Sequence, residues 1–301
     1  MISRINQNEK DLLTNRLNYS FNNWKIPLVE MEENMKILII DGCPRKGNTW
    51  KLTLLAMEKI RRLCPDTEFE EITLSKLNLP FCTGCSNCFR LGPEKCPHYS
   101  IVGEVVRKIE QADGIIICST CVGCRETTLL KNLFDHWCYM MHRPYFYKSK
   151  ALIITSAGGK GQAETAQSIE TSLLAVGFNR CYQAAFAVIS WNAYEPDEKA
   201  KRRMGKITRR FLQDVQSGIL HSPKYSLILV YNIMRGMGQH YAEGSRYPTA
   251  DGTWWTDPCR NHSIYFPEVK IPFYKKWFGI LFFCLGKWVG GMKKMEVTYR
   301  K

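Results

Sequence analysis

The stretch at residues 36–53, KILIIDGCPRKGNTWKLT, decides the fold of this chain. Its first six residues form an apolar, largely β-branched run of strand length, and a glycine-containing turn then leads into an amphipathic segment. Similar short runs and helix-length segments alternate as far as residue 217. This alternation is the βαβ pattern of a parallel sheet covered by helices on both faces.

The alternation predicts five strands and five crossover helices. We place strands at 36–41, 68–74, 114–118, 151–156 and 182–189, and helices at 49–63, 101–111, 127–140, 163–176 and 196–215. Right-handed crossovers make this an α/β, doubly wound, five-stranded parallel sheet. We therefore expect three parts: an N-terminal arm at 1–34, the sheet domain at 35–217, and a basic C-terminal extension at 218–301.

Cysteine usage indicates a reducing compartment. The chain has 13 cysteines in 301 residues, and it begins with MISRINQNEKDLL, which contains no apolar run of signal-peptide length. An odd number of cysteines in so long a chain is not typical of a disulfide-stapled protein. We expect a cytoplasmic protein, in which clustered cysteines bind metal or react rather than cross-link.

The loop after the first strand is a candidate phosphate site. Gly42 and Gly47 permit a tight turn, Asn48 or Thr49 can cap the helix, and Arg45 and Lys46 add positive charge. The letters fit neither Walker A nor the dinucleotide Gly-x-Gly-x-x-Gly pattern, which favours a single phosphate. The alternative is a plain strand-to-helix turn. A cysteine phosphatase centred on Cys43 is excluded, because Thr49 stands where that chemistry needs an arginine.

A compact cysteine motif follows the second strand. Residues 81–98 read FCTGCSNCFRLGPEKCPH, which spaces Cys82, Cys85, Cys88 and Cys96 as C-x2-C-x2-C-x7-C. Four converging thiolates are what a four-iron, four-sulfur cluster requires. Structural zinc sites more often use two separated pairs, so zinc and free thiols are the less favoured alternatives. For a second triplet, Cys118, Cys121 and Cys124, we favour one buried thiol and two small loop residues over a second cluster.

Several motifs in order carry a family resemblance. The first strand and its loop, the cysteine-rich insertion, ADGIIICSTCVG followed by LLKNLFDHW, and ALIITSAGGKG together resemble the iron–sulfur flavoproteins of the flavodoxin-like, NAD(P)H-dependent FMN reductase superfamily. The resemblance covers residues 35–190. It departs from the family after the third strand, where Ser-Pro-Val-Tyr is common and this chain has Ser119-Thr120-Cys121-Val122.

The resemblance implies FMN as a cofactor and NAD(P)H as the electron donor. The FMN phosphate would be held by Cys43, Arg45, Lys46, Gly47, Asn48 and Thr49. The flavin ring would lie against Thr120, Cys121, Val122 and Gly123 on one loop and Ala157, Gly158 and Gly159 on another. The implied function is an FMN-dependent oxidoreductase that passes electrons from NAD(P)H through a four-iron, four-sulfur cluster on Cys82, Cys85, Cys88 and Cys96 to an unknown acceptor.

The last third of the chain is chemically different from the rest. Residues 199–301 hold 19 of the 42 Lys and Arg residues but only 6 of the 28 Asp and Glu residues. Within it, residues 271–294 form an aromatic run flanked by lysine pairs, too short and too interrupted to span a bilayer. Two interpretations of this run remain open. One is docking on the chain's own core or on a neighbouring subunit, and the other is an interfacial helix on anionic lipid at the inner face of the membrane.

Two classes of function follow from these features. The first is the oxidoreductase, which we expect to form a homo-oligomer. The second is a non-enzymatic flavodoxin-like module whose cysteines hold zinc and whose tail binds a membrane or a protein. Nucleic acid is not expected as a partner of either, because no recognition motif accompanies the basic charge.

Overall fold

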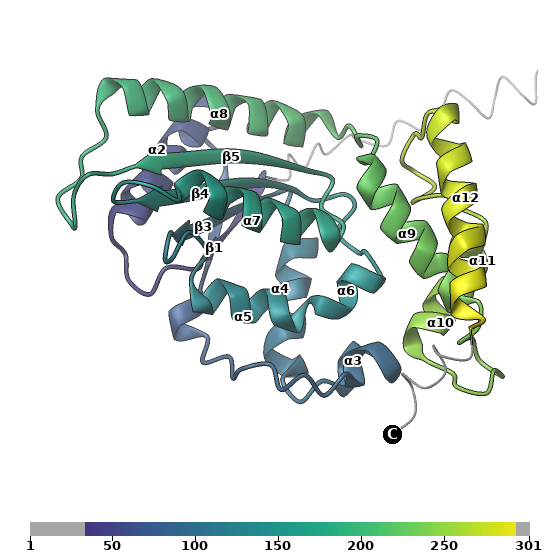
Figure 1. The fold of residues 1–301 in the computed structure, drawn as a ribbon. Helices are drawn as coiled ribbons and strands as arrows, with labels where there is room; N and C mark the ends of the chain where they lie inside the picture. Colours follow the sequence, from purple (N-terminus) through teal and green to yellow (C-terminus); the bar gives the residue numbers. More distant parts are fainter. Residues whose placement is uncertain (1–33, 293–301) are drawn as a thin grey trace, which may run out of the picture. The chain divides into compact units, whose positions relative to one another are not determined.

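A computed structural model describes residues 34–292 (Figure 1). The arm expected at 1–34 therefore lies, except for Asn34, outside the described residues, as do Lys293 and Lys294 of the aromatic run. The strands are β1 (Lys36–Asp41), β2 (Glu68–Thr73), β3 (Gly114–Thr120), β4 (Lys150–Ala157) and β5 (Arg180–Ala187). They form an all-parallel sheet in the order β2-β1-β3-β4-β5, which confirms the predicted doubly wound fold.

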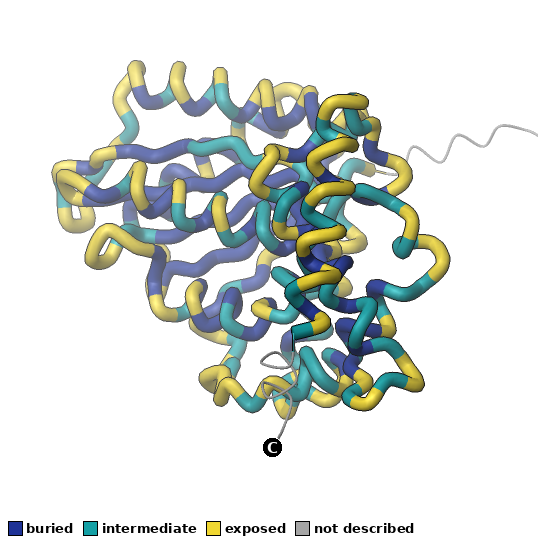
Figure 2. Tube along the Cα trace, turned by 45° about the vertical axis from the view of Figure 1, so that its right-hand side comes forward, coloured by how far each residue is buried: buried dark blue, intermediate teal, exposed yellow. Residues whose placement is uncertain are grey.

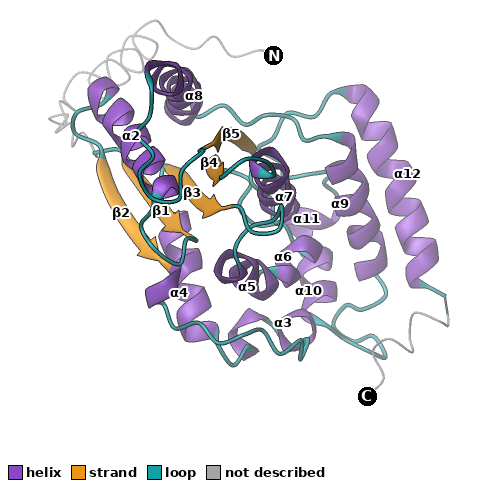
Figure 3. Cartoon of the chain, turned by 60° about the vertical axis from the view of Figure 1, so that its left-hand side comes forward, coloured by secondary structure: helices purple, strands orange, loops and turns teal. Residues whose placement is uncertain are grey.

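The sheet is buried on both faces because its strands alternate side chains between two helical layers. Ile37 and Ile39 of β1 face one apolar core, and Leu38 and Ile40 face the other. The first core is closed by α2 (Asn48–Leu63) and α8 (Glu198–Ser217). The second is closed by α4 (Tyr99–Glu110), α5 (Thr128–His136), α6 (Cys138–His142) and α7 (Gln162–Ala175), as Figure 3 shows from the side.

The single helix predicted at 127–140 is instead two helices. Trp137, with φ −89° and ψ 3°, separates α5 from α6. Its indole is fully buried among Phe134 and Phe146, with ring centroids 5.9 Å and 5.7 Å away. The tertiary packing of this large side chain accompanies a change of chain direction that helical periodicity does not reveal.

The C-terminal extension is helical and has its own aromatic core. Its elements are α9 (Tyr225–Gly238), α10 (Ala250–Thr256), α11 (Pro258–Asn261) and α12 (Phe273–Gly290). Tyr231, Trp255 and Tyr265 are buried in this core, and Phe266 stacks on Tyr147 of the sheet domain at 3.9 Å. Across the described residues, no helix combines the length and apolarity needed to cross a membrane.

Candidate functional site

The strand order brings three loops to one edge of the sheet. Strands β1, β3 and β4 are neighbours and parallel, so the segments after Asp41, Thr120 and Ala157 leave the sheet side by side (Figure 3). Open sheets of this class bind ligands beyond the carboxyl ends of their strands. The structure therefore places the two predicted flavin loops and the predicted phosphate loop together.

The start of α2 forms the floor of this edge. Gly47 precedes the helix, no side chain caps it, and its first turn contains no acidic residue. Asn48 and Thr49 are buried, and Thr49 Oγ1 lies 2.6 Å from Ser156 Oγ at the end of β4. A helix N-terminus with free N–H groups and a basic flank is suited to an anion.

Asn48 ties this helix start to the loop after β5. Its Nδ2 donates to the carbonyl oxygens of Ser190 at 2.7 Å and Trp191 at 3.3 Å. Its Oδ1 is buried and has no protein partner. A buried acceptor without a partner is costly, so this atom is suited to receive a ligand hydroxyl or N–H group.

A cavity of about 240 Å³ opens between these loops. It brings together nine of the predicted cofactor residues: Cys43, Arg45, Gly47, Asn48, Thr49, Thr120, Cys121, Ala157 and Gly158. It also includes Pro44, Ser156, Val188, Ser190 and Trp191, which the sequence did not suggest. The general rule about strand ends could have pointed to the loop after β5, since that strand shares the same edge.

Four predicted cofactor residues do not line this cavity. The ammonium group of Lys46 pairs with Glu71 at 2.8 Å and lies 3.8 Å from the Trp50 ring centroid. Val122 and Gly123 lie in the turn after β3, and Gly159 follows Gly158 in open space. Arg45 is therefore the basic residue of this loop that lines the cavity, and its Nη1 donates to Asn192 Oδ1 at 2.5 Å.

A buried acidic and thiol cluster supports the phosphate loop from below. Asp41 Oδ1 accepts from the Cys43 N–H at 3.0 Å and from the Cys118 thiol at 3.3 Å. A hydrogen bond with Cys43, together with burial, raises the pKa of Cys118 well above its ordinary value. Cys118 is thus a buried core thiol that points toward β1, as the sequence interpretation favoured.

The motif cysteines meet in a second cavity. Cys82, Cys85, Cys88 and Cys96 all line a space of about 290 Å³, which His98 and Asp135 also border. His136 at the end of α5 and Cys138 at the start of α6 line the same space. Cys138 lies 42 positions beyond Cys96, so spacing within the motif could not include it.

The cysteine loop, residues 77–98 with the four motif cysteines, is held by side chains from α5 and from the segment after α6. Asn132 accepts from the Cys82 N–H at 3.1 Å and donates to the carbonyl oxygens of Leu79 and Pro80, each at 3.1 Å. The buried Arg143 donates to the Cys88 carbonyl oxygen. Its Nε also lies 2.7 Å from Asp251 Oδ1 of α10, an ion pair through which the C-terminal extension reaches the cysteine loop.

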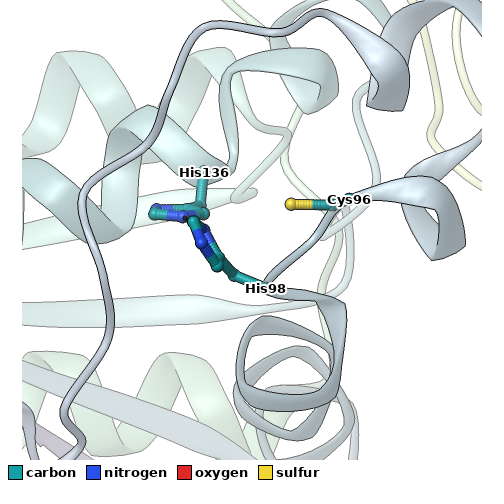
Figure 4. Close-up of side chains that lie close together, drawn as sticks. All are labelled: Cys96, His98 and His136. Atoms are coloured by element: carbon teal, nitrogen blue, oxygen red, sulfur yellow. Dashed lines mark hydrogen bonds between the residues drawn. The ribbon is translucent and has the colours of Figure 1, made fainter.

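Cys96, His98 and His136 form a tight group within this cavity, and Figure 4 shows the Cys96 sulfur directed toward the two rings. Their ligand atoms all lie within 4.8 Å of one another. His98 Nδ1 lies 2.9 Å from His136 Nε2, and His136 Nδ1 lies 2.8 Å from the Asn132 carbonyl oxygen. Nearby, burial first and then Cys96 and Cys85 raise the pKa of the Cys88 thiol to about 11.

Known flavoproteins are similar to this chain in sequence. Residues 35–192 match the family described as NADPH-dependent FMN reductase. An iron–sulfur flavoprotein of Clostridioides difficile is 26% identical over 67% of this chain and 91% of its own length. One of Methanocaldococcus jannaschii is 33% identical over 48% of this chain and 77% of its own length.

A solved structure of the flavoenzyme FerB from Paracoccus denitrificans, an NAD(P)H:acceptor oxidoreductase, superimposes with a TM-score of 0.46 at 18% identity, covering 61% of this chain and 98% of that one.

The family match spans more than half of the chain, including the β1 loop and the cysteine motif. The chain belongs to the NADPH-dependent FMN reductase family, as an FMN-dependent flavoprotein oxidoreductase related to the iron–sulfur flavoproteins.

Proposed function

We propose that this chain is an FMN-dependent oxidoreductase that takes electrons from NAD(P)H and passes them through a four-iron, four-sulfur cluster on Cys82, Cys85, Cys88 and Cys96 to an acceptor. The observation that carries the proposal is the cavity of about 290 Å³ in which all four motif cysteines meet. In this scheme residues 35–217 form the FMN-binding domain, and α10 of the extension at 218–301 braces the cysteine loop through Asp251.

The residues at the sheet edge suit FMN. The uncapped start of α2 with Arg45 would hold the phosphate, and the unpartnered Asn48 Oδ1 would receive a hydroxyl of the ribityl chain. A Cβ atom on Gly158 or Gly159 would meet nothing within 4 Å, which leaves open space along the loop proposed for the flavin ring. When bound, FMN supplies the two-electron to one-electron chemistry that the amino acids lack.

The spacing of the thiols favours a cluster over a single zinc ion. Zinc bonded to thiolates at about 2.3 Å holds their sulfurs about 3.8 Å apart. Within residues 34–292, two groups of three or more candidate ligands have all their ligand atoms within 4.8 Å, and neither contains more than one motif cysteine. As they stand, no three motif sulfurs lie close enough together for one zinc ion to bind all three, which supports the larger group.

A second candidate function rests on the tight group described above. Cys96, His98 and His136 are ligand types that zinc prefers, and His136 is oriented through its other nitrogen as metal-binding histidines commonly are. This group is the observation behind the alternative of a flavodoxin-like module with a structural zinc site, here with two histidines in addition to a motif cysteine. Zinc there would have to replace the hydrogen bond between His98 and His136.

Cys88→Ala separates these accounts, with Cys138→Ala as the matched control from the same cavity. For the anaerobically prepared protein, we expect Cys88→Ala to lose most of its iron and Cys138→Ala to keep it, while both variants retain FMN. NAD(P)H should still reduce the flavin in both. Full iron content in Cys88→Ala, or zinc in place of iron in the parent protein, would refute the cluster.

We further propose that α12 lies on an anionic membrane surface. Its glycine face packs on α9: a Cβ atom at Gly286 would lie 2.3 Å from the Ile233 carbonyl oxygen. The opposite face exposes Phe273, Trp277, Leu281 and Trp288, at 76%, 71%, 61% and 66%. Figure 2 shows how buried and exposed positions alternate along the chain, including its helices. Exposed lysines at 276 and 287 add the charge that suits anionic lipid.

Co-sedimentation with vesicles tests this contact. The full protein should bind vesicles containing phosphatidylserine, and binding should weaken with salt because exposed charges are screened. Trp277→Ser with Trp288→Ser should lose binding, whereas Trp191→Ser, which removes an exposed tryptophan far along the chain, should not. If the double variant instead dissociates a dimer while vesicles never bind the parent, the face is the contact of the expected homo-oligomer and the membrane proposal is wrong.

A further inference from the structure

Cys121 and Cys124 lie on a strained turn between β3 and α5. Val122 and Arg125 pair across the turn, with N–H to carbonyl oxygen distances of 2.9 Å and 3.1 Å. The central residues Gly123 and Cys124 have φ of +58° and +62°, as in a type I′ turn. Glycine adopts this conformation freely, but cysteine does so at a cost. The turn thus holds Cys124 in a left-handed backbone conformation that cysteine rarely adopts.

The two thiols converge on the residue before α7. A Cβ atom built on Gly161 would lie 2.7 Å from Cys121 Sγ and 2.9 Å from Cys124 Sγ. The two sulfurs are therefore at most about 5.6 Å apart, the sum of those distances. Side-chain rotation can close such a gap to a disulfide. Gly161 leaves the space free because it has no Cβ atom, and its φ of +101° favours glycine there.

The pair connects the cavity of about 240 Å³ at the sheet edge, which we propose for FMN and call the flavin cavity, with solvent. Cys121 lines that cavity, and its N–H donates to the Ser156 carbonyl oxygen at 2.8 Å, which fixes the loop against β4. Cys124 is exposed. Cys118 does not complete a third position, because it is buried and its thiol donates to Asp41. Two thiols without a third ligand suit reversible disulfide chemistry better than metal binding.

We propose that Cys121 and Cys124 form a redox-active dithiol that exchanges an electron pair with the flavin. In the reducing direction the Cys121–Cys124 sulfur–sulfur bond breaks, and the two sulfurs take up two electrons and two protons while reduced FMN returns to its oxidised form. NAD(P)H, the donor of the family, restores reduced FMN by transfer of a hydride, with one proton taken from solvent. The net result is oxidation of NAD(P)H and reduction of one disulfide. The proposal needs the flavin cavity and does not depend on the cysteine motif.

Peptide mapping of the FMN-loaded protein tests the thiol chemistry directly. The protein is equilibrated without oxygen in reduced and oxidised dithiothreitol at graded ratios, then alkylated and digested. The peptide carrying both cysteines should change between dialkylated and disulfide forms in a single two-electron transition. In Cys124→Ser, Cys121 should stay alkylatable under every ratio. A parent protein that never forms this disulfide would overturn the proposal.

Anaerobic titration with NADPH then tests the link to the flavin. Oxidised parent protein should consume about one more NADPH per chain than Cys124→Ser before the flavin stays reduced, since the disulfide takes up one electron pair. Cys259→Ser, which removes an exposed lone cysteine of the extension, should behave like the parent. Equal consumption by the parent and Cys124→Ser would show that the thiols do not exchange electrons with the flavin.

Discussion

The flavin cavity and the cysteine cavity are built in different ways. Around the flavin cavity, the phosphate loop runs between a six-residue strand and the 16-residue α2, and its Asn48 and Thr49 are buried. Around the cysteine cavity, the chain from Leu77 to His98 has only the four-residue α3 (Asn87–Arg90) and the three-residue η2 (Pro93–Lys95). Regular backbone shapes the first site, whereas distant side chains shape the second.

From this difference we infer that the cysteine cavity, but not the flavin cavity, needs its bound ligand to keep its shape. We expect strand and helix ends to keep the phosphate loop in place with or without FMN, because its neighbours β1 and α2 are regular, hydrogen-bonded elements of the core. The cysteine loop relies on the side chains of Asn132 and Arg143 and, in our account, on bonds to iron. Metal binding and local folding should therefore be coupled at the second site only.

Metal removal should give the largest contrast between the two regions. After chelation under mildly oxidising conditions, we expect amide hydrogen exchange in residues 82–96 to accelerate at least about tenfold, because the thiolate bonds no longer close the loop. Exchange in residues 42–50 should be unchanged when FMN is retained. Equal acceleration of exchange in both segments would contradict the claim that only the cysteine loop depends on its ligand.

Arg143 offers the next largest effect. Arg143→Leu removes the donor to the Cys88 carbonyl oxygen and takes the guanidinium away from the buried Asp251, which keeps His142 at 2.8 Å as a partner. Breaking a buried ion pair of this kind costs about 3 kcal/mol of unfolding free energy, which denaturant titration measures. Arg107→Leu, in an exposed pair with Glu104, should lower the unfolding free energy far less, because solvent screens that pair. A similar small loss for both would mean that the extension does not brace the loop.

The two basic residues of the phosphate loop should differ in a smaller way. Arg45 lines the flavin cavity, so Arg45→Ala should weaken FMN affinity about tenfold, which is about 1.4 kcal/mol. Lys46 pairs with Glu71 outside the cavity, so Lys46→Ala should change affinity less than about threefold. Fluorescence titration of the apoprotein with FMN measures both. A larger loss for Lys46→Ala than for Arg45→Ala would show that Lys46, and not Arg45 alone, holds the phosphate.

The sequence predicted what local patterns determine. The strands, the α2 start and the four motif cysteines follow from β-branched runs, turn chemistry and spacing within a few residues. It could not predict partners that the fold brings from afar: Cys138 in the cysteine cavity, Asn132 fifty positions after Cys82, or Trp191 beside the phosphate loop. The aromatic core of the extension was missed for the same reason, because its members are scattered between Tyr231 and Val269.

Metal analysis of the anaerobically purified protein tests the central claim most directly. Iron, acid-labile sulfide, zinc and FMN are measured on the same sample, with the visible spectrum as a second readout. Our account predicts about four iron and four sulfide per chain together with one FMN, and broad absorbance from thiolate-bound iron beneath the flavin bands. About one zinc per chain with no iron or sulfide would contradict it, and would assign the cavity to Cys96, His98 and His136 as a structural metal site.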